Sequence, residues 1–375
     1  MTAFTVVFLS AIVYVIFWFV VAFMFKGGLE EWAKDMRAGG YRISHSEPVL
    51  GGFPFRVRLS ADKPEVTAPD GAWSWSGQRA TIEARPWRPD LVEVALEGGH
   101  RFTFPGPGGA KTYRGGGAIG AVLDFDLSVD GPAAAEIRIR DLDLAAAGKE
   151  ASKPASIIAA RRADLTLARY PDGDADYRTP TFDLRFDGEG MTVPRDMGLP
   201  LGHVIESLSF EAGVLGPVGP GSWPDSLAVW RDLGGTVEVR DLRAVYGPMT
   251  IKASGTMAVD AEVQPIGAFT AKVQGFFEII DTLKRHGLVG GADAMAAKLL
   301  LGVMSRRPEG GGPPALNLAI TIQDQKLFAG PVKLADIPTV KWPAVKWDNS
   351  DRADGPPSSP QENATMQSPE PKGAE

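Results

Sequence analysis

The chain has 375 residues, a formal net charge of −7 and no cysteine, and it contains 44 glycines and 30 prolines. An acidic chain lacks the basic stripe that nucleic acid binding needs, and it is not expected to dock electrostatically on anionic lipid head groups. The abundance of glycine and proline predicts many turns, and therefore many short strands.

The N-terminal region contains a run of 22 residues without a charge, from Phe4 to Phe25. As a helix this run spans about 33 Å, enough to cross a bilayer core of about 30 Å. It is longer than the apolar core of a signal peptide, and no Ala-x-Ala-like cleavage site follows it. We therefore predict a transmembrane signal anchor at residues 4–25, preceded by a short tail at residues 1–3. The alternative, a buried core helix, would show a polar face, and the run has none.

The orientation of this anchor rests on a default argument. Lys26 is soon followed by Glu30 and Glu31, so the Lys/Arg distribution around the run gives almost no orientation signal. A short N-terminal tail normally stays in the cytoplasm while the long remainder is translocated. The expectation is a single-pass protein of the bacterial inner membrane with the bulk of the chain in the periplasm. The absence of cysteine fits a periplasmic domain without disulfides and a cytosolic domain equally well.

Residues 26–40 have the spacing of a juxtamembrane helix. Leu29, Trp32, Ala33 and Met36 recur at helical intervals, and Gly39 and Gly40 form a stop. Trp32 fits the membrane interface, and it fits packing on the first strands equally well.

From residue 41 to about 275 apolar and polar residues alternate with a period of two, as in 53–59, 123–130, 137–140, 182–187 and 251–263. Such alternation is typical of antiparallel strands with one apolar face and one solvated face. The glycine-rich stretch 105–120 is expected to be a loop. The fold class is therefore predicted as mainly β: a transmembrane helix followed by an elongated, curved antiparallel sheet within a β-rich periplasmic domain at 41–345.

Two interruptions of the β pattern are helical. Residues 225–233 end at Gly234-Gly235, a strong stop, and residues 276–304 carry two apolar stripes separated by Gly290-Gly291. The second region is predicted to be an insert of two helices with a short joint. Residues 346–375 contain almost no apolar side chains and are predicted to form a disordered tail.

No pattern of catalytic or metal-ligating residues emerges from the sequence. The four histidines are scattered, no Gly-x-Ser-x-Gly elbow occurs, and residues 106–112 fail the phosphate-loop pattern. Paired carboxylates such as Asp141 and Asp143 are too few to hold a hard cation, and a solvated strand face explains them better. The sequence therefore predicts no enzyme, no cofactor and no metal, with an undetected hydrolase as the open exception.

Several short strings follow the N-terminal anchor in this order: Gly52-Phe53-Pro54-Phe55-Arg56, Trp87-Arg88-Pro89, Trp230-Arg231-Asp232-Leu233-Gly234-Gly235, Tyr246-Gly247-Pro248, Gln264-Pro265-Ile266-Gly267 and Leu327-Phe328-Ala329-Gly330-Pro331. Together they resemble those of an uncharacterised bacterial envelope family, domain of unknown function 2125. The resemblance covers about residues 1–345, and the N-terminus departs from it in lacking the usual basic residues. The segment 255–275 also resembles the repeat unit of AsmA-type envelope proteins, which implies an inner-membrane protein that moves phospholipid along a long folded sheet. The residues that carry the strings, interpreted as fold-defining, are Gly52, Phe53, Pro54, Trp87, Pro89, Trp230, Gly234, Gly235, Gln264, Pro265, Gly267, Gly330 and Pro331.

Two functional hypotheses remain open. In the first, the membrane-anchored sheet keeps part of its apolar face uncovered and binds or transfers a phospholipid or another acyl lipid along it. In the second, the strands fold into two sheets that cover one another, and the protein is an envelope scaffold or assembly partner with a closed core. The protein partners are unknown. The residues predicted to face lipid are Ile251, Ala253, Gly255, Met257, Val259, Ala261 and Val263.

Overall fold

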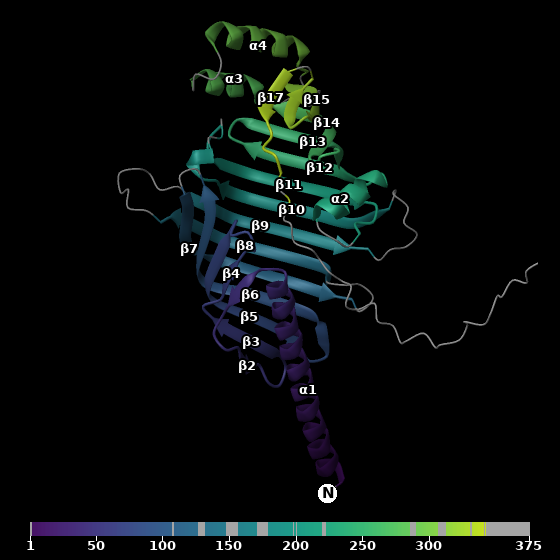
Figure 1. Cartoon of the computed structure of the whole chain (residues 1–375). Coiled ribbons are helices and arrows are strands. Elements are labelled where there is room, and N and C mark those ends of the chain that lie inside the picture. The colour runs from purple at the N-terminus through teal and green to yellow at the C-terminus, as the bar shows by residue number, and fades with distance from the viewer. Residues whose placement is uncertain are drawn as a thin grey trace, which may run out of the picture.

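A computed structural model of the chain describes one long apolar helix, a single long antiparallel sheet and three further α-helices (Figure 1). The residues it describes are 2–106, 109–126, 132–147, 157–170, 179–197, 199, 201–219, 223–285, 290–306, 313–330, 332–340 and 342. The tail predicted at residues 346–375 lies outside this set.

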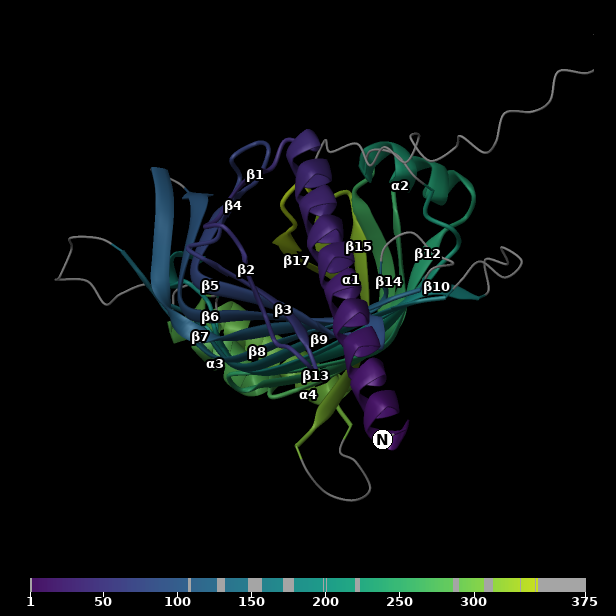
Figure 2. The ribbon, with the colours of Figure 1, turned by 90° about the horizontal axis from the view of Figure 1, so that it is seen from below.

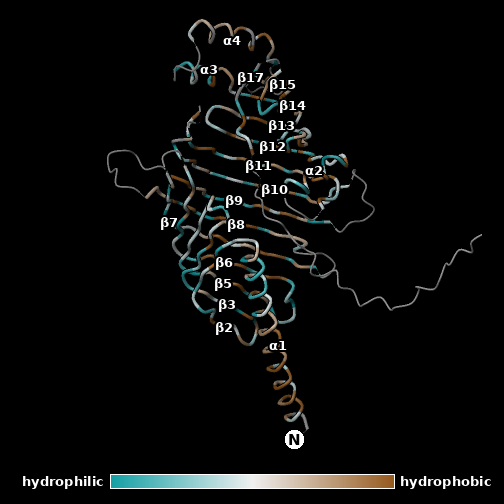
Figure 3. Tube along the Cα trace, in the orientation of Figure 1, coloured by the Kyte–Doolittle hydropathy of each residue, from teal (hydrophilic) through white to brown (hydrophobic). Residues whose placement is uncertain are grey.

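Helix α1 spans Thr2–Ala38 without a break, so the predicted anchor and the predicted juxtamembrane helix form one continuous helix. It ends where Gly40 takes a φ of +88°, a conformation that glycine adopts without steric cost. Figure 3 shows that its N-terminal part is continuously hydrophobic and projects away from the sheet. α1 is long and apolar enough to cross a bilayer, which indicates single-pass membrane anchoring.

The sheet is formed by strands that pair antiparallel with their neighbours, mostly in chain order from β2 to β17. Short strands β1 and β4 form a side branch, in which β1 pairs with β4 and β4 pairs with one end of β5, while β3 pairs with the other end of β5. The strands are β1 Arg42–Ser44, β2 Val49–Gly51, β3 Val57–Asp62, β4 Glu65–Thr67, β5 Ser74–Arg85, β6 Arg88–Gly106, β7 Gly109–Phe125, β8 Pro132–Ala146, β9 Ile157–Arg169, β10 Pro180–Thr192, β11 Val204–Leu215, β12 Thr236–Tyr246, β13 Met249–Val259, β14 Pro265–Gln274, β15 Ala315–Gln323, β16 Lys326–Ala329 and β17 Val332–Asp336.

The sheet is strongly curved, and Figure 2 shows it as a trough whose walls and floor are formed by the same strands. The pairing is interrupted at a similar level on every strand from β5 to β10, and at this level the register shifts between β5 and β6 and between β7 and β8, which places bulges on a line across the sheet. Four residues on this line have positive φ, namely Gly98, Gly117, Asp141 and Gly190. Because bulges bend strands, this line of bulges accounts for the bend of the sheet along the trough.

The glycine-rich stretch 105–120, expected to be a loop, is instead mostly strand: β6 ends at Gly106 and β7 begins at Gly109. Glycine is required there for close strand approach. A Cβ on Gly115 would lie 1.8 Å from the carbonyl oxygen of Asp143, and one on Gly117 would lie 2.7 Å from the Cα of Leu142. The expectation was wrong because composition alone does not reveal a long-range contact that needs glycine.

Helix α2 spans Trp223–Asp232, and helices α3 Phe276–Arg285 and α4 Gly291–Met304 form the predicted two-helix insert. Figure 1 shows α3 and α4 at the end of the sheet that lies farthest from the N-terminus. Buried Trp230 anchors α2: its indole N–H donates to the carbonyl of Leu215 at 2.9 Å, and Gly235 lies against its ring.

Candidate functional site

The candidate functional site is the apolar face of the sheet, which is continuous from β3 to β15. At each step the register places an apolar residue opposite an apolar residue of the next strand, so that one row crosses twelve strands. We call this set the apolar row; its members are Leu59, Ile82, Val94, Ala121, Ile137, Leu165, Phe186, Phe210, Leu242, Ala253, Ala271 and Leu318.

The two ends of the apolar row are covered and its middle is open. Leu59 near the first end is 2% exposed, and Ala253 and Ala271 near the other end are 8% and 0% exposed. None of the row residues from Ile82 to Leu242 is buried, and Ile137 is 37% exposed. An uninterrupted apolar surface of this kind on a folded domain marks a site of interaction with another apolar group.

The apolar row lies on the face of the sheet toward α1. Val57, two residues from Leu59 on the same strand face, is fully buried in a cluster with Trp18, Val21 and Ala22 of α1. Figure 2 shows the C-terminal part of α1 between the two walls of the trough, at its mouth. The apolar row therefore lines the concave side of the trough.

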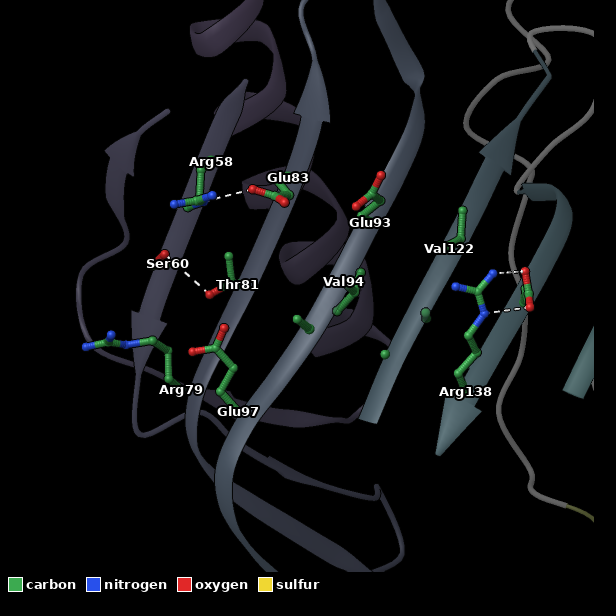
Figure 4. Close-up of a pocket in the computed structure, with 14 residues that line it drawn as sticks. Arg58, Ser60, Arg79, Thr81, Glu83, Glu93, Val94, Glu97, Val122 and Arg138 are labelled. Atoms are coloured by element: carbon green, nitrogen blue, oxygen red, sulfur yellow. Dashed lines mark hydrogen bonds and ion pairs between the residues drawn. The ribbon is translucent and has the colours of Figure 1, made fainter. Parts of the chain in front are cut away.

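The opposite face of the sheet carries ion pairs between neighbouring strands (Figure 4). Arg58 pairs with Glu83 at 2.8 Å, and Arg138 pairs with Glu136 at 2.6 Å on the same strand. These side chains line a shallow cavity of about 390 Å³. Within the described part of the chain, no group of three or more histidine, aspartate or glutamate residues is placed to hold a metal ion.

Arginine holds two carboxylates of this outer face, Glu136 and Asp164, in their ionised form. The hydrogen bond from Arg138 lowers the pKa of Glu136 below its ordinary value. For Asp164, burial raises the pKa, but the hydrogen bonds from Arg140 and Arg162 together outweigh burial, so its pKa is also lowered. Lowered carboxyl pKa values are typical of a structural salt-bridged surface and do not suit a general acid.

The structure places the residues predicted to face lipid in two environments. Ile251, Ala253, Gly255 and Met257 follow one another on the concave side of β13, where Ala253 joins a cluster with Ala271 and Val273. β13 ends at Val259. Ala261 and Val263 lie beyond it, in a turn where Val263 has a φ of +57°.

Most of the fold-defining residues gather along one rim of the sheet, at the connections that follow or precede the strands there. Gln264 is an example: buried in the turn before β14, it accepts from the N–H of Val340 at 2.8 Å and donates to that residue's carbonyl at 3.2 Å. Gly330 follows β16 at the other rim, and Pro331 lies outside the described residues.

The residues predicted from sequence to face lipid were confined to segment 251–263, and the apolar row on the other strands, such as Ile137, Leu165 and Phe186, was missed. The signal was present, because those strands show the same alternation. What the sequence did not reveal is that the apolar positions of successive strands align across the sheet.

The family model described as an uncharacterised protein conserved in bacteria, DUF2125, matches residues 18–338. The chain therefore belongs to the DUF2125 family. No curated protein and no solved structure matches it.

Proposed function

We propose that this protein is a membrane-anchored lipid-binding protein that holds acyl chains on the concave face of its sheet. The observation that carries the proposal is the apolar row, which crosses twelve strands and is open between Ile82 and Leu242. The AsmA-like resemblance of segment 255–275 supports the same function. The proposal assigns binding or transfer to the protein and no chemical step.

The physical gain from such binding is large. Each buried methylene contributes about 0.8 kcal/mol, so an acyl chain that buries roughly ten of them gains about 8 kcal/mol before ordering costs. Strands lie about 4.8 Å apart, so a row across twelve strands is about 53 Å long. That length suits a path for several chains, or for one lipid at successive positions, better than a single closed pocket.

The scaffold alternative requires two sheets that cover one another. The described strands form one open sheet, and their apolar face is left partly exposed at Ile137 and its neighbours. No observation on the described residues favours the closed core.

The lipid proposal is tested with a photoactivatable phospholipid carrying a diazirine in its acyl chain, incorporated with the full-length protein into vesicles. The wild type is expected to be labelled on peptides from the concave face. Leu165→Glu places a charge in the middle of the apolar row and is expected to reduce labelling of β8–β10 severalfold. The matched control is Thr166→Glu on the next, exposed residue of the outer face, which is expected to label like the wild type. Equal labelling of the two variants contradicts the proposal.

We further propose that the sheet lies in the periplasm and α1 in the bacterial inner membrane. The support is the resemblance to an envelope family together with the more than three hundred residues that follow the apolar run. Because the chain has no cysteine, a single Leu233→Cys change at an exposed position gives a specific label site. A membrane-impermeant maleimide is expected to label this cysteine in cells whose outer membrane alone has been permeabilised. Labelling that requires rupture of the inner membrane contradicts the periplasmic placement.

A further inference from the structure

The loop between β2 and β3 lies beside the apolar part of α1, within the span expected to cross the membrane. The hydroxyl of Tyr14 donates to the carbonyl of Pro54 at 2.5 Å, and the indole N–H of Trp18 donates to the carbonyl of Arg56 at 2.9 Å. The rings of Trp18 and Phe53 meet edge to face at 5.4 Å. The first hairpin of the sheet is therefore fixed to the membrane helix through three contacts.

The position of these contacts along α1 sets the depth of the loop. Trp18 lies seven residues and Tyr14 eleven residues before Phe25, the last residue of the uncharged run, which places them about 10 Å and 16 Å from its end along a helix. The run spans about 33 Å and the hydrocarbon core about 30 Å, so sliding the helix outward would leave apolar residues in water at one end. A loop fixed at this level lies below the membrane surface.

The side chains of this region suit a lipid environment. Phe53 is 53% exposed, Phe55 is 68% exposed, and neighbouring Val49 is 69% exposed. Because Val57 pairs with Ala84, the turn between β5 and β6 lies next to the β2–β3 loop. Trp87 at the tip of this turn is 53% exposed. Aromatic side chains of this kind are enriched where a protein meets a bilayer.

Several backbone groups of the loop have the internal partners that a site with little water requires. Pro54 has no N–H, and its carbonyl is bonded to Tyr14. The N–H of Arg56 donates to the carbonyl of Gly52 at 2.9 Å, and the carbonyl of Arg56 is bonded to Trp18. Irregular backbone within a bilayer requires such internal partners, because an unpaired polar group there costs several kcal/mol.

We propose that the β2–β3 loop and the Trp87 turn insert into the same bilayer leaflet as the second half of the apolar run, so that the sheet begins inside the membrane. The occupant of this exposed apolar edge is the acyl region of the bilayer. Arg56 pairs with Glu83, and Arg88 pairs with Asp90 at 2.9 Å, so each arginine next to the inserted turns is neutralised by a carboxylate. A consequence that rests on the proposed lipid-binding function is that the open part of the apolar row, which begins at Ile82 next to the covered Leu59, lies beside the leaflet from which a lipid can enter.

The insertion is tested by depth-dependent fluorescence on the full-length protein, which has no native cysteine to remove. The variant Phe55→Cys changes an exposed residue, and its cysteine is labelled with an environment-sensitive nitrobenzoxadiazole group. The matched control is Leu233→Cys, an exposed apolar position on the same rim, eight strand spacings or about 38 Å along the sheet. Both proteins are placed in vesicles of phosphatidylcholine and phosphatidylglycerol, with or without phosphatidylcholine spin-labelled in its acyl chain.

The Phe55 label is expected to emit at shorter wavelength than the Leu233 label and to be quenched severalfold more by the spin-labelled lipid. Emission and quenching equal to those of the Leu233 label would overturn the insertion. This outcome is distinguishable from a failure of lipid binding. If Leu165→Glu still reduces acyl-chain labelling severalfold, the concave face binds lipid that enters elsewhere. If the Phe55 label is quenched but the concave face is not labelled, insertion holds and the lipid-binding function fails.

Discussion

Ala253→Trp is expected to lower the free energy of unfolding by about 1–3 kcal/mol or more, whereas Ile137→Trp is expected to change it by less than about 0.5 kcal/mol. Both residues belong to the apolar row, but Ala253 is 8% exposed within a packed cluster and Ile137 is 37% exposed. An indole at Ala253 has no room without displacing Leu242 or Leu318, which pack against that cluster. An indole at Ile137 extends over an open face.

Urea unfolding of the full chain in detergent, followed by circular dichroism, measures this difference. Lys252→Trp is the matched control for Ala253→Trp, since residue 252 is the preceding residue of β13 and faces the opposite side of the sheet. Its midpoint is expected to stay near that of the wild type. An Ala253→Trp protein as stable as this control would contradict the packed core around β13 and show that this end of the row is open as well.

The contrast between these two positions describes how the concave face is organised. Around β12 to β15 the apolar side chains pack on one another and form a local core. Between β6 and β11 the same row is partly exposed and offers contact area to another molecule. A protein that used the whole face only to stabilise itself would have no reason to leave the central strands uncovered.

The sequence predicts the strands and their faces well and their pairing poorly. Alternation in segments such as 182–187 and 251–263 identifies an apolar side for each strand, and the long uncharged run identifies α1. Alternation does not say which strand lies next to which, so one open sheet and two mutually covering sheets are equally compatible with the sequence. The strand pairing in the structure, which aligns Ile137 with Leu165 and Phe186, shows that the chain forms one open sheet.

The errors of the sequence-based reading have local physical causes. The strand expected through Val263 ends at Val259 because the carboxylate of Asp260 accepts from the N–H groups of Glu262 and Gln264, which folds the chain into a turn. Positions 115 and 117 lie in a strand, and they are glycine because the backbone of the neighbouring strand lies too close for a side chain. Both effects depend on hydrogen bonds or contacts that residue type and period do not encode.

The proximity of the β2–β3 loop to Tyr14 and Trp18 likewise could not be predicted from the sequence. The string Gly52-Phe53-Pro54-Phe55-Arg56 is one of those that carry the resemblance to the family, and its physical role becomes visible only when α1 lies beside it. Sequence position separates the loop and the helix contacts by about forty residues, and no periodicity links them.

Site-specific photocrosslinking at two adjacent residues tests the central claim most directly. A benzophenone amino acid is incorporated at Ile137 or at Arg138 of the full-length protein in cells; both positions are exposed, and they face opposite sides of β8. After irradiation, mass spectrometry of the purified protein is expected to show a lipid adduct at Ile137 at least tenfold more abundant than at Arg138. Equal adducts at both positions, or no lipid adduct at Ile137, would contradict the assignment of the concave face as a lipid-binding surface.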